Sequence, residues 1–331
     1  MKPLIDRGTA ARAKACCAAA YGSDVVALLL GDSYHPGGLA LTRRLATRLN
    51  PRAGQRVLDV ASGRGTTALT LAAEYGVEVI GVDLSDSNVA LASAAAQAAG
   101  LAGQVRFQVG DAERLGADAS WFDAVVCECA LCTFPDKPTA VGELARVLKP
   151  GGRVGITDVT ADPDRLPPQL TGLGAWIACV ADARPLHEYA ALLAAAGLRV
   201  THTERHDQAI TAMVDQIEAR LTLVRMTARK RAEALGLDFD RAPAVLAATR
   251  AAIAEGVLGY ALLVADKPGH VADKPGHVAD KPGSVYGEEW GQHIPEETSN
   301  GPDESRSAGG AGAAAVRWGG PRVEPGGRAG Q

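Results

Sequence analysis

Short apolar, β-branched runs alternate with longer Ala- and Leu-rich segments throughout residues 1–266. Strand–helix alternation of this kind predicts a parallel sheet that is covered by helices on both faces. The expected strands are residues 56–60, 78–82, 105–108, 124–127, 153–157, 198–203 and 258–264. The sequence therefore predicts one α/β domain.

Two apolar stripes with helical spacing support this prediction. The first consists of Ala140, Leu144, Val147 and Leu148, and the KPGG sequence at residues 149–152 ends it. The second consists of Ile210, Val214, Ile217, Leu221 and Val224. It predicts a helical insertion, at about residues 208–256, before the last strand.

The C-terminal part has a different composition. A seven-residue repeat, LVADKPG followed by HVADKPG twice, covers residues 263–283, and a Gly-, Pro- and Ser-rich segment follows. Such a sequence cannot bury a core, so we expect a disordered tail at residues 267–331. We predict an N-terminal helical cap at residues 1–44 and the α/β domain at residues 45–266.

Charge and hydropathy exclude several classes of partner. The net charge of −4 and the pI near 6.0 argue against nucleic acid as the main partner, because nucleic-acid binders need a basic surface. No run approaches the ~18 apolar residues of a membrane span. The N-terminal residues lack the apolar core of a signal peptide. We therefore expect a cytoplasmic protein with reduced thiols, in which clustered cysteines indicate metal binding or reactivity before disulfides.

Acidic residues end three consecutive predicted strands. The first strand runs through Asp59 into the turn ASGRG and then into a helix, so backbone can approach a ligand beside a helix N-terminus. The turn does not read G-x-G-x-x-G, and Asp59 suits a ligand with a positive charge and an amino group better than a pyrophosphate. Asp83 is placed to accept both ribose hydroxyls, and Asp111 can accept from an adenine amino group.

Together, the glycine turn and the three acids resemble the class I S-adenosylmethionine-dependent methyltransferases over about residues 45–267. The resemblance implies a doubly wound, seven-stranded sheet with an antiparallel last strand and S-adenosylmethionine as cofactor. The cofactor contacts that it implies are Asp59, Ala61, Ser62, Gly63, Gly65, Asp83, Leu84, Asp111, Ala112 and Cys127. Ala61 is a departure, because most members carry glycine there.

Three of the six cysteines lie in CECALCTFPDKP at residues 127–138. Cys127 belongs to the fourth strand and is expected to pack in the sheet, because cysteine is often a small buried hydrophobe. Cys129 and Cys132 follow the strand end, where the methyl group would be presented. Other thiols are Cys179, in the sequence WIAC, and the adjacent pair Cys16 and Cys17 in the cap. No spacing is typical of a zinc site, whereas converging soft thiolates suit a thiophilic substrate.

The PDKP turn, the LARVLKPGGRVGITDV segment and the W-x-x-C segment are similar to the arsenite methyltransferases over about residues 125–197. This resemblance implies that the catalytic thiols Cys129 and Cys179 bind As(III) as substrate, with Cys132, Cys16 or Cys17 as a candidate third ligand. It also implies a thiol reductant as partner. The chain departs from longer family members, because no cysteine follows the glycine turn.

Two alternatives stand beside arsenite methylation. The first is a methyltransferase for a small organic acceptor of the quinone, sterol or polyketide type, in which the cysteines only pack. A hydroxyl or amine acceptor would need a base, for which Tyr34, His35 and His187 are candidates. The second is a non-catalytic metalloid-binding protein.

Overall fold

The computed structural model describes residues 14–19, 21, 24–31, 34–171, 179–180, 182–234 and 238–269. Its seven strands are β1 (Arg56–Val60), β2 (Glu78–Asp83), β3 (Val105–Val109), β4 (Phe122–Glu128), β5 (Leu148–Ala161), β6 (Arg199–Arg205) and β7 (Leu258–Asp266). The α-helices are α2 (Asp24–Leu30), α3 (Gly38–Leu49), α4 (Thr66–Tyr75), α5 (Asp86–Ala98), α6 (Lys137–Val147), α8 (Leu186–Ala195), α9 (Asp207–Ala234) and α10 (Ala242–Ala254). Short 3₁₀ turns are η1 (Leu131–Thr133), η2 (Pro163–Arg165) and η3 (Pro168–Leu170).

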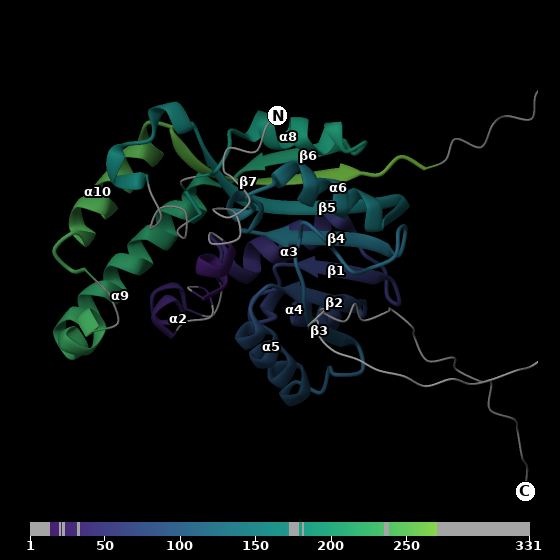
Figure 1. Cartoon of the computed structure of the whole chain (residues 1–331), viewed down its shortest axis with the longest axis horizontal. Coiled ribbons are helices and arrows are strands. Elements are labelled where there is room, and N and C mark those ends of the chain that lie inside the picture. Colours follow the sequence, from purple (N-terminus) through teal and green to yellow (C-terminus); the bar gives the residue numbers. More distant parts are fainter. Residues whose placement is uncertain are drawn as a thin grey trace, which may run out of the picture. The chain divides into compact units, whose positions relative to one another are not determined.

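The strands form one sheet in the order β3-β2-β1-β4-β5-β7-β6 (Figure 1). Neighbours from β3 to β5 are parallel, whereas β7 is antiparallel to both β5 and β6. The strand order reverses between β1 and β4, and ligands of open α/β sheets bind at such a switch point. The predicted seven-stranded sheet with an antiparallel last strand is confirmed.

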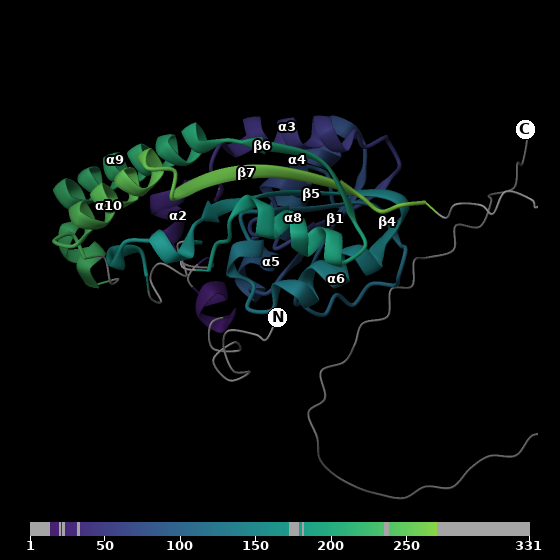
Figure 2. The ribbon, with the colours of Figure 1, turned by 90° about the horizontal axis from the view of Figure 1, so that it is seen from above.

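Each face of the sheet buries its own apolar cluster. Side chains of α3, α4 and α5 pack on one face around Leu45, Leu71 and Ala96. Side chains of α6 and α8 pack on the other face around Leu144 and Leu193. Figure 2 shows α3 and α4 on the opposite side of the sheet from α6 and α8. Because helices cover both faces, the parallel strands are apolar on both sides, as the sequence pattern predicts.

A glycine turn joins β1 to α4. Gly65 is the N-cap of α4 with φ 85°, and a Cβ on it would lie 2.6 Å from the Phe107 ring. Only glycine satisfies both the left-handed backbone and this close approach. The turn therefore brings the N-terminus of α4 against the carboxyl end of β1.

The structure corrects the expected bounds of the fifth strand. β5 spans Leu148–Ala161 rather than residues 153–157, because it pairs with β7 from Arg153 to Ala161. Its first residue, Leu148, was expected to end the preceding helix, but it pairs with Phe122 across a register shift. α6 therefore ends at Val147, and the KPGG sequence at 149–152 lies within β5.

The predicted helical insertion before the last strand corresponds to α9 and α10. α2 lies beside α9 (Figure 1), and Arg220 of α9 donates a hydrogen bond to the Leu29 carbonyl. The predicted boundary at residues 44–45 falls inside α3, and the tail beyond residue 269 lies outside the described residues. In the described part of the chain, no helix has the length and apolar character needed to cross a membrane.

Candidate active site

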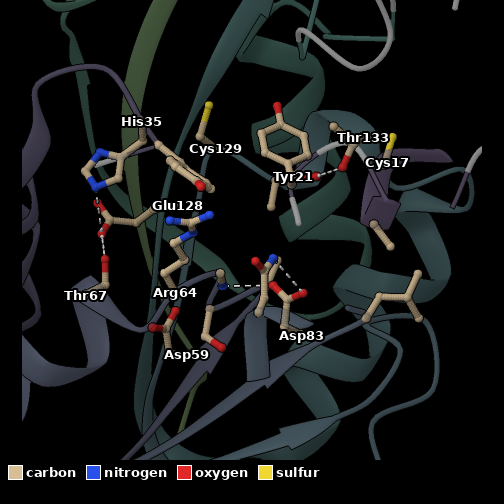
Figure 3. A pocket seen from close by; sticks show the side chains of 18 of the residues that line it. Cys17, Tyr21, His35, Asp59, Arg64, Thr67, Asp83, Glu128, Cys129 and Thr133 are labelled. Carbon is tan, nitrogen blue, oxygen red and sulfur yellow. Dashed lines mark hydrogen bonds and ion pairs between the residues drawn. The ribbon is translucent and has the colours of Figure 1, made fainter. Parts of the chain in front are cut away.

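Two cavities meet at the carboxyl edge of the sheet. The first, which we call the sheet-edge cavity, lies where β1, β2 and β4 end (Figure 3). Its lining includes Lys14, Cys17, Tyr21, Tyr34, His35, Asp59, Ala61, Ser62, Gly63, Arg64, Asp83, Leu84, Asn88, Glu128 and Cys129. The second, the helical cavity, lies among α2, η3, α9 and α10. Tyr21, Tyr34 and Cys129 line both cavities, and they define the junction.

Two buried acids form the strand-end side of the sheet-edge cavity. Asp59 is 2% exposed, and its Oδ2 has no hydrogen-bond partner among the described residues. Burial raises the pKa of Asp59 well above its usual range, and the charges of Glu128 and Asp83 raise it further. The Asp83 carboxylate is fixed by the amides of Gly63 (2.8 Å) and Ser85 (2.9 Å). Such a pair favours a ligand that brings positive charge and hydrogen-bond donors.

Glu128, at the end of β4, is a third buried acid, which the sequence reasoning missed. It accepts hydrogen bonds from the hydroxyls of Thr42 (3.0 Å), Thr67 (2.7 Å) and Thr157 (3.3 Å), and His35 Nε2 lies 3.7 Å away. Figure 3 shows Glu128 between His35 and Thr67. The rule that selected the other strand-end acids would have selected Glu128 as well.

Several buried polar atoms of this cavity indicate what it binds. Ser62 Oγ, Arg64 Nε and Asn88 Oδ1 have no partner in the described part of the chain, like Asp59 Oδ2. Buried polar groups are normally paired, so these atoms are expected to contact a ligand. S-adenosylmethionine fits this set, because it carries a sulfonium and an ammonium for the acids, a carboxylate for Arg64, and hydroxyl and amino donors. The residues present therefore fit the cofactor.

The predicted cofactor contacts divide into two groups. Six of them line the sheet-edge cavity: Asp59, Ala61, Ser62, Gly63, Asp83 and Leu84. Four do not: Gly65, Asp111, Ala112 and Cys127. Cys127 is fully buried in the core beneath α6, so its predicted cofactor contact is replaced by its predicted packing role.

Asp111 and Gly65 do not line the cavity themselves, but they hold or shape residues that do. The Asp111 carboxylate accepts hydrogen bonds from Lys14 Nζ (2.8 and 3.0 Å), and Lys14 itself lines the cavity. Lys14 also donates to Glu113 (2.5 Å). No sequence signal identified Lys14, because it lies about a hundred residues from these acids. Gly65 shapes the turn, and Ala112 packs against the core.

The helical cavity is large and mostly apolar. Its volume of about 720 Å³ lies in the upper part of the range for small-molecule pockets. Its walls are mainly the apolar side chains Val26, Leu29, Leu170, Ile210, Met213, Val214, Ile217, Leu221, Val245 and Leu246. Among the described residues that line it there is no histidine, and the only carboxylate is that of the exposed Asp238. The size and apolar walls of such a cavity suit an apolar small molecule.

Three cysteines from two distant segments converge beside the junction. The Cys179 thiol lies 3.5 Å from the Cys129 carbonyl and 2.9 Å from the Tyr21 hydroxyl. Hydrogen bonds from the Cys129 and Cys132 thiols hold the pKa of Cys179 well below its usual range. The pKa values of Cys129 and Cys132 are raised, by the same contacts and by burial. Of the three thiols, Cys179 is the one whose pKa the cluster lowers.

Cys129 and Cys179 both have left-handed backbone, with φ values of 53° and 63°. A non-glycine residue in this region costs on the order of 1–3 kcal/mol, and such strain clusters at functional sites. The bend at Cys129 also explains its position: alternation along β4 would place it with Cys127, but it packs against the core cluster on the other face.

The remaining candidates lie in different surroundings. Cys17 lines the sheet-edge cavity, and burial, then the charge of Cys179, raises its pKa to about 11. Cys16 is exposed and His187 is exposed on α8, and neither lines either of the two cavities. His35 uses Nδ1 for the Pro36 carbonyl (3.3 Å) and Nε2 for Thr42 (3.3 Å). His187 therefore lies apart from both cavities, and both nitrogens of His35 are engaged.

Metal binding has no further support in the described residues. They contain no group of three or more His, Cys, Asp or Glu side chains arranged to hold a metal ion. The predicted W-x-x-C tryptophan, Trp176, and the repeat histidines, His270 and His277, lie outside the described residues.

Comparisons with known proteins agree with the site. A family described as "Methyltransferase domain" matches residues 57–152. The 27-O-demethylrifamycin SV methyltransferase of Amycolatopsis mediterranei (strain S699) is 32% identical over 237 residues, which cover 69% of this chain and 83% of that protein. The O-methyltransferase resE of Aspergillus sclerotiorum is 40% identical over 37% of this chain, and the match spans only 46% of its own length.

A solved structure shows the same fold. Phosphoethanolamine N-methyltransferase 2 of Haemonchus contortus, in complex with S-adenosyl-L-methionine, superposes with a TM-score of 0.60 at 23% identity, covering 74% of this chain and 56% of that one. Most of the curated relatives are matched over about half of their length. Family membership replaces the non-catalytic alternative with an enzyme. The sheet, the strand-end acids and the rifamycin-type relative together establish that the chain belongs to the class I S-adenosylmethionine-dependent methyltransferases.

Proposed function

We propose that the protein methylates an oxygen of a small, apolar organic acceptor that binds in the helical cavity. The observation that carries this proposal is the 720 Å³ apolar cavity, which meets the sheet-edge cavity at Tyr21, Tyr34 and Cys129. Relatives named as O-methyltransferases support an oxygen acceptor. The organic acceptor therefore replaces arsenite as the leading hypothesis.

The chain's residues hold the two reactants and exclude water. When bound, S-adenosylmethionine supplies a methyl group on a positively charged sulfur. Asp59, Asp83 and Glu128 offset that charge and fix the cofactor, and the apolar walls of the helical cavity orient the acceptor oxygen toward the junction. Holding the reactants in line provides much of the rate enhancement, since methyl transfer needs no covalent enzyme intermediate.

The side chains that could remove a proton from the acceptor limit the class of acceptor. Both nitrogens of His35 are engaged, the described part of the helical cavity wall contains no histidine, and Asp238 is exposed. The lowered pKa of the Cys179 thiol makes it a weak base. We therefore expect an acceptor whose hydroxyl ionises readily, such as a phenol or an enol, rather than an aliphatic alcohol.

The direct test is methyl transfer from radiolabelled S-adenosylmethionine to a panel of acceptors. The panel contains apolar phenols and enols, matched aliphatic alcohols, and arsenite with a thiol reductant. We expect transfer to the phenols or enols. Transfer only to arsenite would overturn the proposal.

Arsenite methylation is retained as a second candidate because the thiols of Cys129, Cys132 and Cys179 are in contact. Three thiolates can hold As(III) with its lone pair free to attack a methyl group. The variants Cys129→Ser and Cys179→Ser separate the two hypotheses. Both should abolish arsenite methylation if As(III) is the substrate, whereas an organic acceptor should still be methylated. Cofactor binding, measured by calorimetry, should be unchanged in either case.

A further inference from the structure

A buried lysine connects the two segments that carry the cysteine cluster. Lys137, the first residue of α6, is 4% exposed. Its ammonium donates to the carbonyls of Cys132 (2.9 Å) and Phe134 (3.1 Å) and to the carboxylate of Asp182. All three donors are thus used, two on the segment after β4 and one on the segment that follows Cys179.

Stability alone does not account for a lysine here. Lysine is rarely buried unless it is paired, and desolvating an ion pair often offsets its attraction. An apolar residue would avoid that cost. The specific property of Lys137 is that it links chain segments about 45 residues apart, as the separation from Asp182 shows.

Asp182 is fixed from its other side as well. Its second oxygen accepts from the Arg184 guanidinium (2.6 Å), and the Arg184 carbonyl accepts from the Ala161 amide (3.2 Å) at the end of β5. Asp182, three residues after Cys179, is therefore held between the PDKP turn and the sheet. This anchoring explains how Cys179 keeps its left-handed backbone, since strained residues persist only when their surroundings fix them.

We propose that Lys137 is a positioning residue that holds Cys179 against Cys129 and Cys132 at the junction of the two cavities. The inference rests on the proposed function in one respect, namely that the acceptor reacts at this junction. The arrangement of the thiols themselves can be measured without any acceptor.

The test measures thiol proximity in a Cys16→Ser/Cys17→Ser background. A bifunctional thiol reagent that fluoresces only after bridging two neighbouring thiols is added, and the Cys179→Ser variant gives the background signal. We expect Lys137→Met to slow the bridging of Cys179 about tenfold, because the thiols lose their mutual orientation. Asp182→Asn keeps the side-chain size and should slow it in the same direction. It provides the test if Lys137→Met does not fold.

The matched control is Lys149→Met. Lys149 also forms an ion pair across the chain, with Asp123 (2.6 Å), but it lies away from the cysteines. It should lower thermal stability without changing the bridging rate. Parental bridging rates in folded Lys137→Met and Asp182→Asn would overturn the inference, and so would an equal loss in Lys149→Met. Since the measurement uses neither cofactor nor acceptor, its result is independent of whether the acceptor panel succeeds.

Discussion

The two cavities share three side chains but are built in different ways. The sheet-edge cavity takes its acids Asp59, Asp83 and Glu128 from the ends of β1, β2 and β4. A backbone amide fixes Asp83, and a hydroxyl fixes Glu128. The helical cavity takes its walls from segments as far apart as Leu29 and Ile217, and they are almost entirely apolar. One cavity is defined by charge and the other by shape.

This difference separates the two tasks of a methyltransferase. A cationic cofactor is recognised by acids that the sheet holds in place before binding, so its site can be common to proteins with unrelated acceptors. An apolar acceptor offers few polar groups, and its recognition depends on complementary shape in a mostly apolar cavity. We therefore expect changes in the two cavities to affect cofactor and acceptor separately.

The largest effect is expected from Asp59→Asn. The substitution removes a carboxylate whose ionised form should pair with the bound cofactor, and a hydrogen bond to a charged group contributes about 1.5–3 kcal/mol. We expect the cofactor Kd to rise about a hundredfold, as measured by calorimetry. The exposed Asp86→Asn is the control, with an unchanged Kd.

The same variant should make the cofactor-free protein more stable. Burial raises the pKa of Asp59, so ionisation of the unfolded chain destabilises the folded state as pH rises above the usual carboxyl range. Asparagine does not titrate. An unchanged cofactor Kd in Asp59→Asn would show that the sheet-edge cavity does not recognise the cofactor through the charge of Asp59.

Filling the helical cavity should affect only the acceptor. Val245→Trp places a large side chain in its wall, and overpacking of this kind typically costs about 1–3 kcal/mol. We expect kcat/KM for the acceptor to fall roughly tenfold or more, with the cofactor Kd unchanged. Ala247→Trp, on the exposed side of α10, is the matched control. Equal losses in both variants would show that the cavity does not select the acceptor.

The sequence predicted one cavity far better than the other. The strand-end acids and Ala61 could be predicted from the sequence, because a parallel sheet brings consecutive strand ends together however its helices pack. The walls of the helical cavity depend on how α2, α9 and α10 pack, and apolar stripes do not specify their partners. Cys129 and Cys179 were paired by resemblance to a family. Lys137 and its link to Asp182 had no local signal, since they depend on tertiary packing.

Asp158, a buried acid beside the cysteine cluster, should make the folding stability depend on pH. Its Oδ2 accepts from the Cys132 amide (3.0 Å), and burial, then the charge of Cys179, raises its pKa to about 7. Between the ordinary pKa of 3.8 and about 7, the unfolded chain ionises at this residue while the folded chain does not. The protein therefore loses stability as pH rises through this window, and the loss levels off above it.

Asp158→Asn should remove that part of the pH dependence. We expect the difference in unfolding free energy between variant and parent to change by up to about 2 kcal/mol across the window. This is below the upper limit for the full pKa shift, since each pKa unit corresponds to roughly 1.4 kcal/mol. Urea unfolding at several pH values from 4.5 to 8 measures it. Parallel curves for the two proteins would mean that Asp158 ionises normally.

The smallest effect concerns Ala61, which has a φ of 59° in the turn where most family members carry glycine. The left-handed conformation costs an L-residue about 1–2 kcal/mol, while glycine loses about 0.5–1 kcal/mol more backbone entropy on folding. Ala61→Gly should therefore stabilise the protein by less than about 1 kcal/mol in urea unfolding, with little change in acceptor kinetics. Asn50→Gly is the control, because Asn50 has a similar φ of 48° at the end of α3 but asparagine tolerates it. A loss of stability in Ala61→Gly, with no change in Asn50→Gly, would show that the Ala61 methyl group packs usefully in the sheet-edge cavity, so that this cavity too is partly defined by shape.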